Sequence, residues 1–147
     1  MEKKITDDEL EKRLKSSFTY KEKAPESIGA MLGLEYVSCN AEAAEGVLSH
    51  VVSEAEINIY GTLHGGIITW LMDTTMGIFG RAYTGYETIV TMDIHVNFLR
   101  PVYAGDEVFI KAKVTHAGSK IVNCISEMYV KDKLAATADS TFFNLNS

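Results

Sequence analysis

The sequence predicts an α+β fold in which a curved antiparallel β-sheet wraps around one long central α-helix. Between Gly65 and Gly80 the residues are almost all apolar or small, and Asp73 is the only charged side chain. We therefore expect a helix that is buried on all sides. After residue 88 the pattern changes to alternating, β-branched segments, which favour strands. The order of helix, strands, helix and strands then gives the central helix a single sheet to pack against.

The N-terminal third is expected to be helical and then extended. Residues 7–18 favour a short amphipathic helix with Leu10 and Leu14 on one face. A further helical turn is expected over residues 26–31, because it follows a proline and ends before a glycine. The first two strands are expected at residues 34–39 and 47–52.

The central helix is expected to end near residues 81–85. Four strands follow, separated by short segments that contain Pro, Gly, Ser or Asp. Because these strands are consecutive and the turns are short, we expect them to form an antiparallel meander in which sequence neighbours pair. The four strands are expected at residues 89–99, 107–116, 121–130 and 134–143.

Length and charge limit the class of protein. The 147 residues fit one domain with a sizeable core, which we divide into an N-terminal helical extension (1–32) and a main domain (33–147). A formal charge of −6 and the absence of a basic, aromatic groove argue against nucleic acid as a partner. Neither a signal peptide nor a membrane-spanning segment is expected, so we predict a cytoplasmic protein without membrane association.

Metal and redox chemistry have little support in the sequence. The two cysteines are far apart and in strand-like segments, so we expect reduced core thiols rather than a disulfide or a nucleophile. The four histidines show neither HExxH spacing nor a Cys/His cluster, so we predict no metal site and no cofactor. These residues are Cys39, Cys124, His50, His64, His95 and His116.

The most informative motif joins a loop to the start of the central helix. Asn58 lies six residues before His64-Gly65-Gly66, and Asp73 follows nine residues after His64. Thr91 lies near the start of the long strand that ends at Asn97-Phe98-Leu99-Arg100-Pro101. With this combination the chain resembles the hot-dog fold thioesterases, specifically the PaaI-like acyl-CoA thioesterase branch, over roughly residues 33–145. The resemblance implies hydrolysis of an acyl-CoA to a carboxylic acid and free coenzyme A without a metal or redox cofactor.

The chemistry of the motif can also be argued from the residues. Thioester hydrolysis needs an attacking group and donors that stabilise the oxyanion formed at the carbonyl. Gly65 and Gly66 begin a helix, where free N–H groups and the positive end of the dipole face outward and no Cβ blocks a substrate. We predict that the Gly65 N–H is the oxyanion donor, that Gly66 is part of the substrate site, and that the Asn58 amide orients or polarises the thioester.

Burying an Asp without a partner on an apolar helix costs free energy of folding, so its presence there needs a reason. We predict that Asp73 is the catalytic carboxylate. It can act as a general base toward water or as a nucleophile that gives a transient anhydride, and the sequence leaves both open. The alternative is a buried carboxylate bonded to backbone or to a neighbouring Thr. The resemblance implies that the Thr91 hydroxyl helps to place the water, although strand alternation groups Thr91 with Asp93, His95 and Asn97 rather than with the apolar face.

His64 has two interpretations, a direct catalytic role or a ring bonded to backbone that holds the loop. Cations that could bind the phosphates of coenzyme A are spread along the chain. In the hairpin Gly118-Ser119-Lys120, the Lys side chain lies close in sequence to backbone N–H groups that could also bind a phosphate. Ordinary surface charge is the alternative for each. The candidate cations are Arg81, Arg100, Lys111, Lys113 and Lys120.

The spacing of the site residues also bears on assembly. Gly65 and Asp73 are eight residues apart, about 12 Å along a helix, so one thioester carbonyl cannot touch both. If both act on one substrate, the carboxylate must come from a second subunit, which predicts a two-fold homodimer with composite sites. The resemblance implies the same dimer, and often a homotetramer.

Two other functions remain open at this stage. A dehydratase or hydratase acting on hydroxyacyl or enoyl thioesters shares the fold, but those relatives pair a His with a carboxylate in other motif contexts. A non-catalytic acyl-CoA-binding protein is the third hypothesis, and it would not need Asp73. The acyl group, whether aromatic, medium-chain or long-chain, is not determined by side-chain identity, and a carrier-protein thioester is equally compatible.

Overall fold

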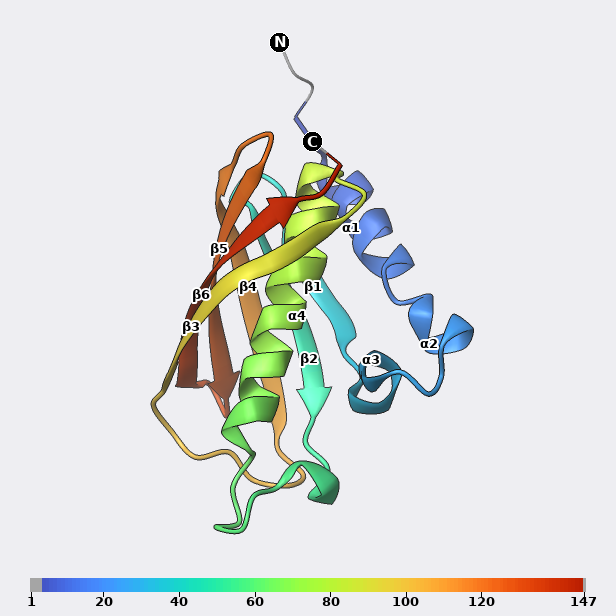
Figure 1. The fold of residues 1–147 in the computed structure, drawn as a ribbon. Coiled ribbons are helices and arrows are strands. Elements are labelled where there is room, and N and C mark those ends of the chain that lie inside the picture. The colour runs from blue at the N-terminus through green and yellow to red at the C-terminus, as the bar shows by residue number, and fades with distance from the viewer. Residues whose placement is uncertain (1–3, 147) are drawn as a thin grey trace.

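In the computed structural model, residues 4–146 are described, so residues 1–3 of the predicted extension and Ser147 lie outside the described residues. Helix α4 (Gly65–Thr84) crosses one face of a curved, six-stranded antiparallel sheet (Figure 1). The prediction of an α+β hot-dog fold, with a sheet wrapped around a central helix, is confirmed. The strands are β1 (Glu35–Asn40), β2 (Glu45–Val51), β3 (Ile89–Phe98), β4 (Glu107–Ala117), β5 (Ile121–Val130) and β6 (Lys133–Asn144).

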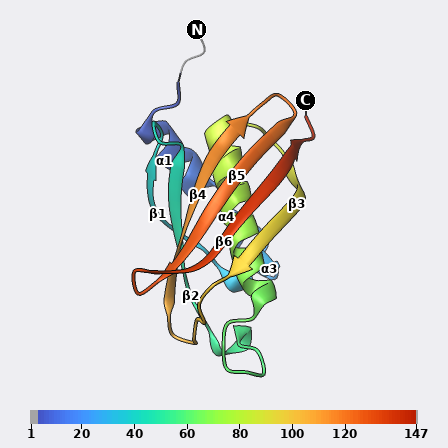
Figure 2. The ribbon, with the colours of Figure 1, turned by 90° about the vertical axis from the view of Figure 1, so that its left-hand side faces the viewer.

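The strand order corrects the predicted meander. The order is β1-β2-β4-β5-β6-β3, so β4, β5 and β6 are a meander but β3 pairs with β6 at the far edge (Figure 2). The chain enters β3 directly after crossing the sheet along α4, and residues 99–106 then return it to the middle of the sheet. Alternation defines a strand and its buried face, but it does not define the strand's partner, so the sequence could not give this pairing.

One side of α4 is buried as predicted and the other is not. Leu71, Met76 and Phe79 are at most 1% exposed and face the sheet. The other side carries a stripe of residues that are only partly buried or are exposed, so the expectation of burial on all sides is wrong for the single chain. This stripe contains Trp70, Asp73, Thr74, Gly77, Ile78 and Arg81. Gly85 ends the helix in the left-handed conformation, at φ 76°.

In the N-terminal extension, α1 lies along α4 and β1 (Figure 1). It consists of α1 (Asp7–Ser16), α2 (Tyr20–Lys23) and α3 (Ile28–Leu32), of which α2 was not predicted. Leu10 and Leu14 are buried, as expected from their spacing. The Arg13 guanidinium donates to the Ala82 carbonyl at 3.0 Å, which ties α1 to the last turn of α4. The boundary at residue 33 between extension and main domain stays a prediction.

No helix within residues 4–146 has the length and apolar character needed to cross a bilayer.

Candidate active site

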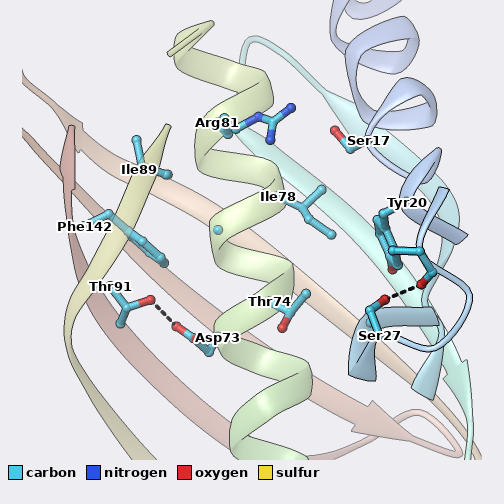
Figure 3. A pocket seen from close by; sticks show the side chains of 13 residues that line it. Ser17, Tyr20, Ser27, Asp73, Thr74, Ile78, Arg81, Ile89, Thr91 and Phe142 are labelled. Carbon is cyan, nitrogen blue, oxygen red and sulfur yellow. Dashed lines mark hydrogen bonds between the residues drawn. The ribbon is translucent and has the colours of Figure 1, made fainter. Parts of the chain in front are cut away.

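Asp73 and Thr91 are in contact although they are 18 positions apart in the sequence. The Thr91 hydroxyl donates to Asp73 Oδ1 at 2.8 Å, from β3 to the middle of α4 (Figure 3). Asp73 is only partly buried and the other carboxylate oxygen, Oδ2, has no hydrogen-bond partner among residues 4–146. The carboxylate is therefore positioned on one oxygen and available on the other. The local alternative, in which a Thr of the same helix holds Asp73, is not what the structure shows.

A β-bulge explains why Thr91 points at the helix. Thr91 pairs with Phe142 and Asp93 pairs with Thr141, so Met92 is an extra residue in β3. An extra residue reverses which side chains face inward. Before the bulge Ile89 lies against Gly80 of α4, and after it the residues packed on the core are Ile94 and Val96. Plain alternation therefore placed Thr91 on the wrong face.

His64 holds the start of α4. It is the N-cap residue, and its Nδ1 accepts a hydrogen bond from the Gly66 N–H at 2.9 Å. The backbone N–H of His64 donates a hydrogen bond to the Glu56 carbonyl. These contacts match the structural interpretation of His64. They also occupy the Gly66 N–H, whereas the Gly65 N–H donates no hydrogen bond within the described chain.

Asn58 shapes the loop before the helix. Its Oδ1 accepts from the backbone N–H groups of Tyr60 and Thr62, at 2.9 and 3.2 Å, and its Nδ2 donates to Thr62 Oγ1. One of the two amide hydrogens is thus used inside the loop. The predicted role of Asn58 toward a thioester stays a prediction.

The continuous helix keeps Gly65 and Asp73 apart. Both belong to α4 without interruption, so their separation of eight positions spans about 12 Å. Gly65 lies beside Phe98 at the end of β3, because a Cβ built on Gly65 would meet the Phe98 ring at 3.4 Å. The donor and the carboxylate of one chain therefore do not converge on one carbonyl.

The predicted phosphate contacts lie at opposite ends of α4. The Gly118-Ser119-Lys120 hairpin lies near its C-terminal end, where the Tyr86 hydroxyl donates to the Gly118 carbonyl at 2.7 Å. The Gly118 N–H is used too, by the Ile121 carbonyl. Arg100 follows β3 at the N-terminal end, about 30 Å away along a 20-residue helix. One chain does not bring these groups together, and only Arg81 shares a cavity with Asp73.

That cavity is a groove of about 460 Å³ on the partly exposed side of α4 (Figure 3). Asp73 and Thr91 lie on one side of it, and the N-terminal extension lines the other. The size is within the range of small-molecule sites, roughly 300–1,000 Å³. The groove is lined by Ser17, Tyr20, Ala24, Ser27, Gly29, Asp73, Thr74, Gly77, Ile78, Arg81, Ile89, Thr91 and Phe142.

The pair of His50 and Glu56, a buried His beside a carboxylate, was not predicted. His50 and Glu56 are each 5% exposed; His50 Nε2 lies 2.8 and 3.0 Å from the Glu56 oxygens, and Nδ1 lies 2.7 Å from the Gly33 carbonyl. Because both side chains are closed to solvent, the pair is not open to a substrate. This contact links His50 on β2 to Glu56, in the segment that leads to His64.

Other reactive groups give no alternative centre. Burial raises the pKa of the Cys124 thiol to about 12, so it stays protonated and is a poor nucleophile. Cys124 is buried, as expected of a core thiol, whereas Cys39 is only partly buried, and both are free. Among residues 4–146 no three His, Cys, Asp or Glu side chains are grouped so that they could hold a metal ion.

Comparison with known proteins places the chain in a family. Residues 60–136 match the sequence profile of the Thioesterase superfamily. The protein named "Putative esterase SSO2140" from Saccharolobus solfataricus is 32% identical over 111 residues, which cover 74% of this chain and 77% of that protein.

Solved structures have the same fold. The Escherichia coli PaaI protein, from the phenylacetic acid degradation operon, superposes with a TM-score of 0.79 at 20% identity, covering 92% of this chain and 96% of that one. The smu.793 protein of Streptococcus mutans, solved with bound acetyl CoA, gives a TM-score of 0.69 at 23% identity, with coverage of 76% and 87%. From its matched residues, its curated relative and its fold, the chain belongs to the Thioesterase superfamily and is a thioester hydrolase.

Proposed function

We propose that this protein hydrolyses acyl-CoA thioesters, releasing a carboxylic acid and free coenzyme A, as a PaaI-like thioesterase. The observation that carries the proposal is the Asp73 carboxylate, held by Thr91 and lining a ligand-sized groove. The acyl-CoA substrate is further supported by the acetyl CoA bound in the S. mutans structure. No metal or redox cofactor is required for this reaction.

The residues suggest how the steps proceed. Thr91 holds Oδ1, so Oδ2 is free to take a proton from water, whose oxygen then attacks the thioester carbonyl. Alternatively Oδ2 attacks the carbonyl itself and water hydrolyses the resulting anhydride. In both routes the carbonyl oxygen becomes negatively charged, and the Gly65 N–H at the start of α4 is the proposed donor to it. Collapse of the tetrahedral intermediate expels the coenzyme A thiolate.

We further propose that the site is shared between two subunits of a homodimer. The separation of Gly65 from Asp73 supports this, because only a neighbouring chain can supply the second group. One surface is suited to a partner: the β3 edge of the sheet, where Val90 and Met92 are 40% and 59% exposed. Two such dimers would give the tetramer that the family resemblance implies. We propose a cytoplasmic location, in keeping with the free thiols.

Gly65→Pro is expected to lower kcat for acyl-CoA hydrolysis by roughly 10²–10³-fold, the effect of removing one oxyanion donor. Proline has no N–H and suits the first position of a helix. His64 already has the extended conformation, at φ −60° and ψ 132°, that a following proline requires. The measurement is release of free thiol from a panel of aromatic and aliphatic acyl-CoAs.

Gly65→Ala is the matched control, because it keeps the N–H and adds a Cβ that only touches the Phe98 ring. Because it keeps the oxyanion donor, it is expected to be more active than Gly65→Pro, and any loss relative to the wild type measures the effect of the added Cβ. Equal activity of the Pro and Ala variants would remove the Gly65 N–H from the mechanism. Wild-type inactivity across the panel, with acyl-CoA still bound, would instead favour the binding-protein hypothesis.

Subunit complementation tests the shared site. Asp73→Asn and Gly65→Pro homodimers are both expected to be inactive, since each composite site lacks one group. After the two variants are mixed, unfolded and refolded together, about a quarter of the wild-type activity is expected, because half of the dimers are mixed and each has one intact site of two. If both groups act from one chain, mixing restores nothing.

A further inference from the structure

The N-terminal extension contributes to the groove beside Asp73, although it lies outside the residues that match the family profile. We propose that Tyr20, on α2, is a specificity-determining residue whose ring forms the far side of the acyl-binding groove and limits the length of the acyl group. This inference rests on the proposed acyl-CoA hydrolysis. It assigns part of substrate selection to residues 17–29.

The groove has a floor and two sides. The floor is the exposed side of α4, where Thr74, Gly77 and Ile78 follow Asp73. One side is formed by β3 and β6, and the other by α2 and α3. In Figure 3, Thr74 and Ile78 lie between Tyr20 on one side and the pair of Asp73 and Thr91 on the other. An acyl chain that starts at Asp73 and follows the floor of the groove therefore reaches the Tyr20 ring.

The lining fits an acyl chain better than coenzyme A. Gly77 leaves the floor open, and Phe142 lies next to it, because a Cβ on Gly77 would be 3.5 Å from the Phe142 ring. Ile78 and Ile89 add further apolar surface. Arg81 is the only cation among the lining residues, and a single cation is a poor match for the several phosphate charges of coenzyme A. With the thioester carbonyl at Asp73, the acyl group would therefore lie in the groove, and the coenzyme A part would point away from it.

Packing holds the Tyr20 ring in place. A Cβ built on Gly29 would come within 2.9 Å of Tyr20 Cε2, so the ring rests directly on the Gly29 backbone. The Tyr20 hydroxyl is buried and has no hydrogen-bond partner within residues 4–146. Burial, with the nearby Glu35 charge, raises the pKa of Tyr20, so the phenol stays neutral. Since the hydroxyl is closed to solvent, the part of Tyr20 that faces the groove is its ring.

The test is a series of saturated straight-chain acyl-CoAs of increasing length, assayed with the wild type, Tyr20→Phe and Tyr20→Ala. Removing the ring is expected to raise kcat/KM for chains just beyond the wild-type limit by at least about tenfold, the effect of making room for one or more methylenes. Tyr20→Phe keeps the ring and is expected to keep the wild-type length profile. Tyr20→Leu, a smaller change in packing, is expected to give an intermediate shift.

The outcomes separate this inference from the proposed function. Hydrolysis by all variants with one common length profile would overturn the role of Tyr20 and leave the thioesterase proposal standing. A shifted profile in Tyr20→Phe would also overturn it, since the hydroxyl would then matter more than the ring. If no variant hydrolyses any acyl-CoA, the proposed function fails, and calorimetric binding of the same series to wild type and Tyr20→Ala still tests the length limit. Circular dichroism of each variant confirms its fold, and Tyr20→Leu replaces any alanine variant that does not fold.

Discussion

Asp73→Asn is expected to lower kcat/KM for acyl-CoA hydrolysis by roughly 10²–10⁴-fold, the contribution of a positioned general base, while the fold is retained. The amide has the shape of the carboxyl group, and its oxygen can still accept the Thr91 hydrogen bond that holds Asp73 at 2.8 Å. It has no basic oxygen and is a far weaker nucleophile, so both routes to the product are blocked. Release of free thiol, measured at matched dimer concentration, gives the loss.

Asp139→Asn is the matched control, because Asp139 is an exposed carboxylate on β6. The same chemical change there is expected to leave the rate unchanged. Asp73→Ala is expected to be as inactive as Asp73→Asn. If Asp73→Asn kept wild-type kcat/KM, Asp73 would be only a structural residue, and the proposed mechanism would be wrong.

Glu56→Ala is expected to lower the free energy of unfolding by about 1–3 kcal/mol, the cost of leaving a buried hydrogen-bonding group of His50 without its partner. His50 is 5% exposed, and its Nε2 would face the space left by the Glu56 carboxylate without that partner. The Glu56 side chain also accepts the Ser53 N–H, so the turn before the site would lose a second contact. Urea unfolding at a fixed protein concentration measures the change.

Two further variants test why Glu56→Ala lowers the free energy of unfolding. Glu56 belongs to a short 3-10 helix (Glu54–Glu56), and Glu54→Gln, which changes an exposed carboxylate of that helix, is expected to be near neutral. The double variant His50→Leu, Glu56→Leu removes both polar partners and is expected to recover part of the stability. A Glu56→Gln variant that is fully stable but inactive would contradict this account, because it would make the pair catalytic and revive the dehydratase hypothesis.

The candidate site shows how far its residues could be predicted. The spacing of Asn58, His64, Gly65 and Asp73 around a helix start follows from chain order alone, because all four are local to one loop and one helix. The capping contact of His64 with the Gly66 N–H is local in the same sense. The unprotected Gly65 N–H also follows from its position as the first residue of α4.

The partner of Asp73 was harder to predict. Thr91 reaches it only because Met92 is an extra residue in β3, and a bulge reverses the faces of a strand without changing its composition. The pairing of β3 with β6 and the path of the extension along α4 depend on contacts between distant segments. The buried pair of His50 and Glu56 gave no signal either, since its two residues lie in an ordinary strand and turn.

By itself the sequence determined the six strands and the α-helices other than α2, the apolar helix with its single carboxylate, and the glycine start that leaves a backbone donor free. These features rest on periodicity and local backbone geometry, which neighbouring residues define. Only the tertiary structure decided which strand closes the sheet, that Thr91 faces Asp73, and that Tyr20 lies across the groove from them. Those contacts join segments far apart in the chain, and they depend on how whole faces pack, which no local pattern encodes.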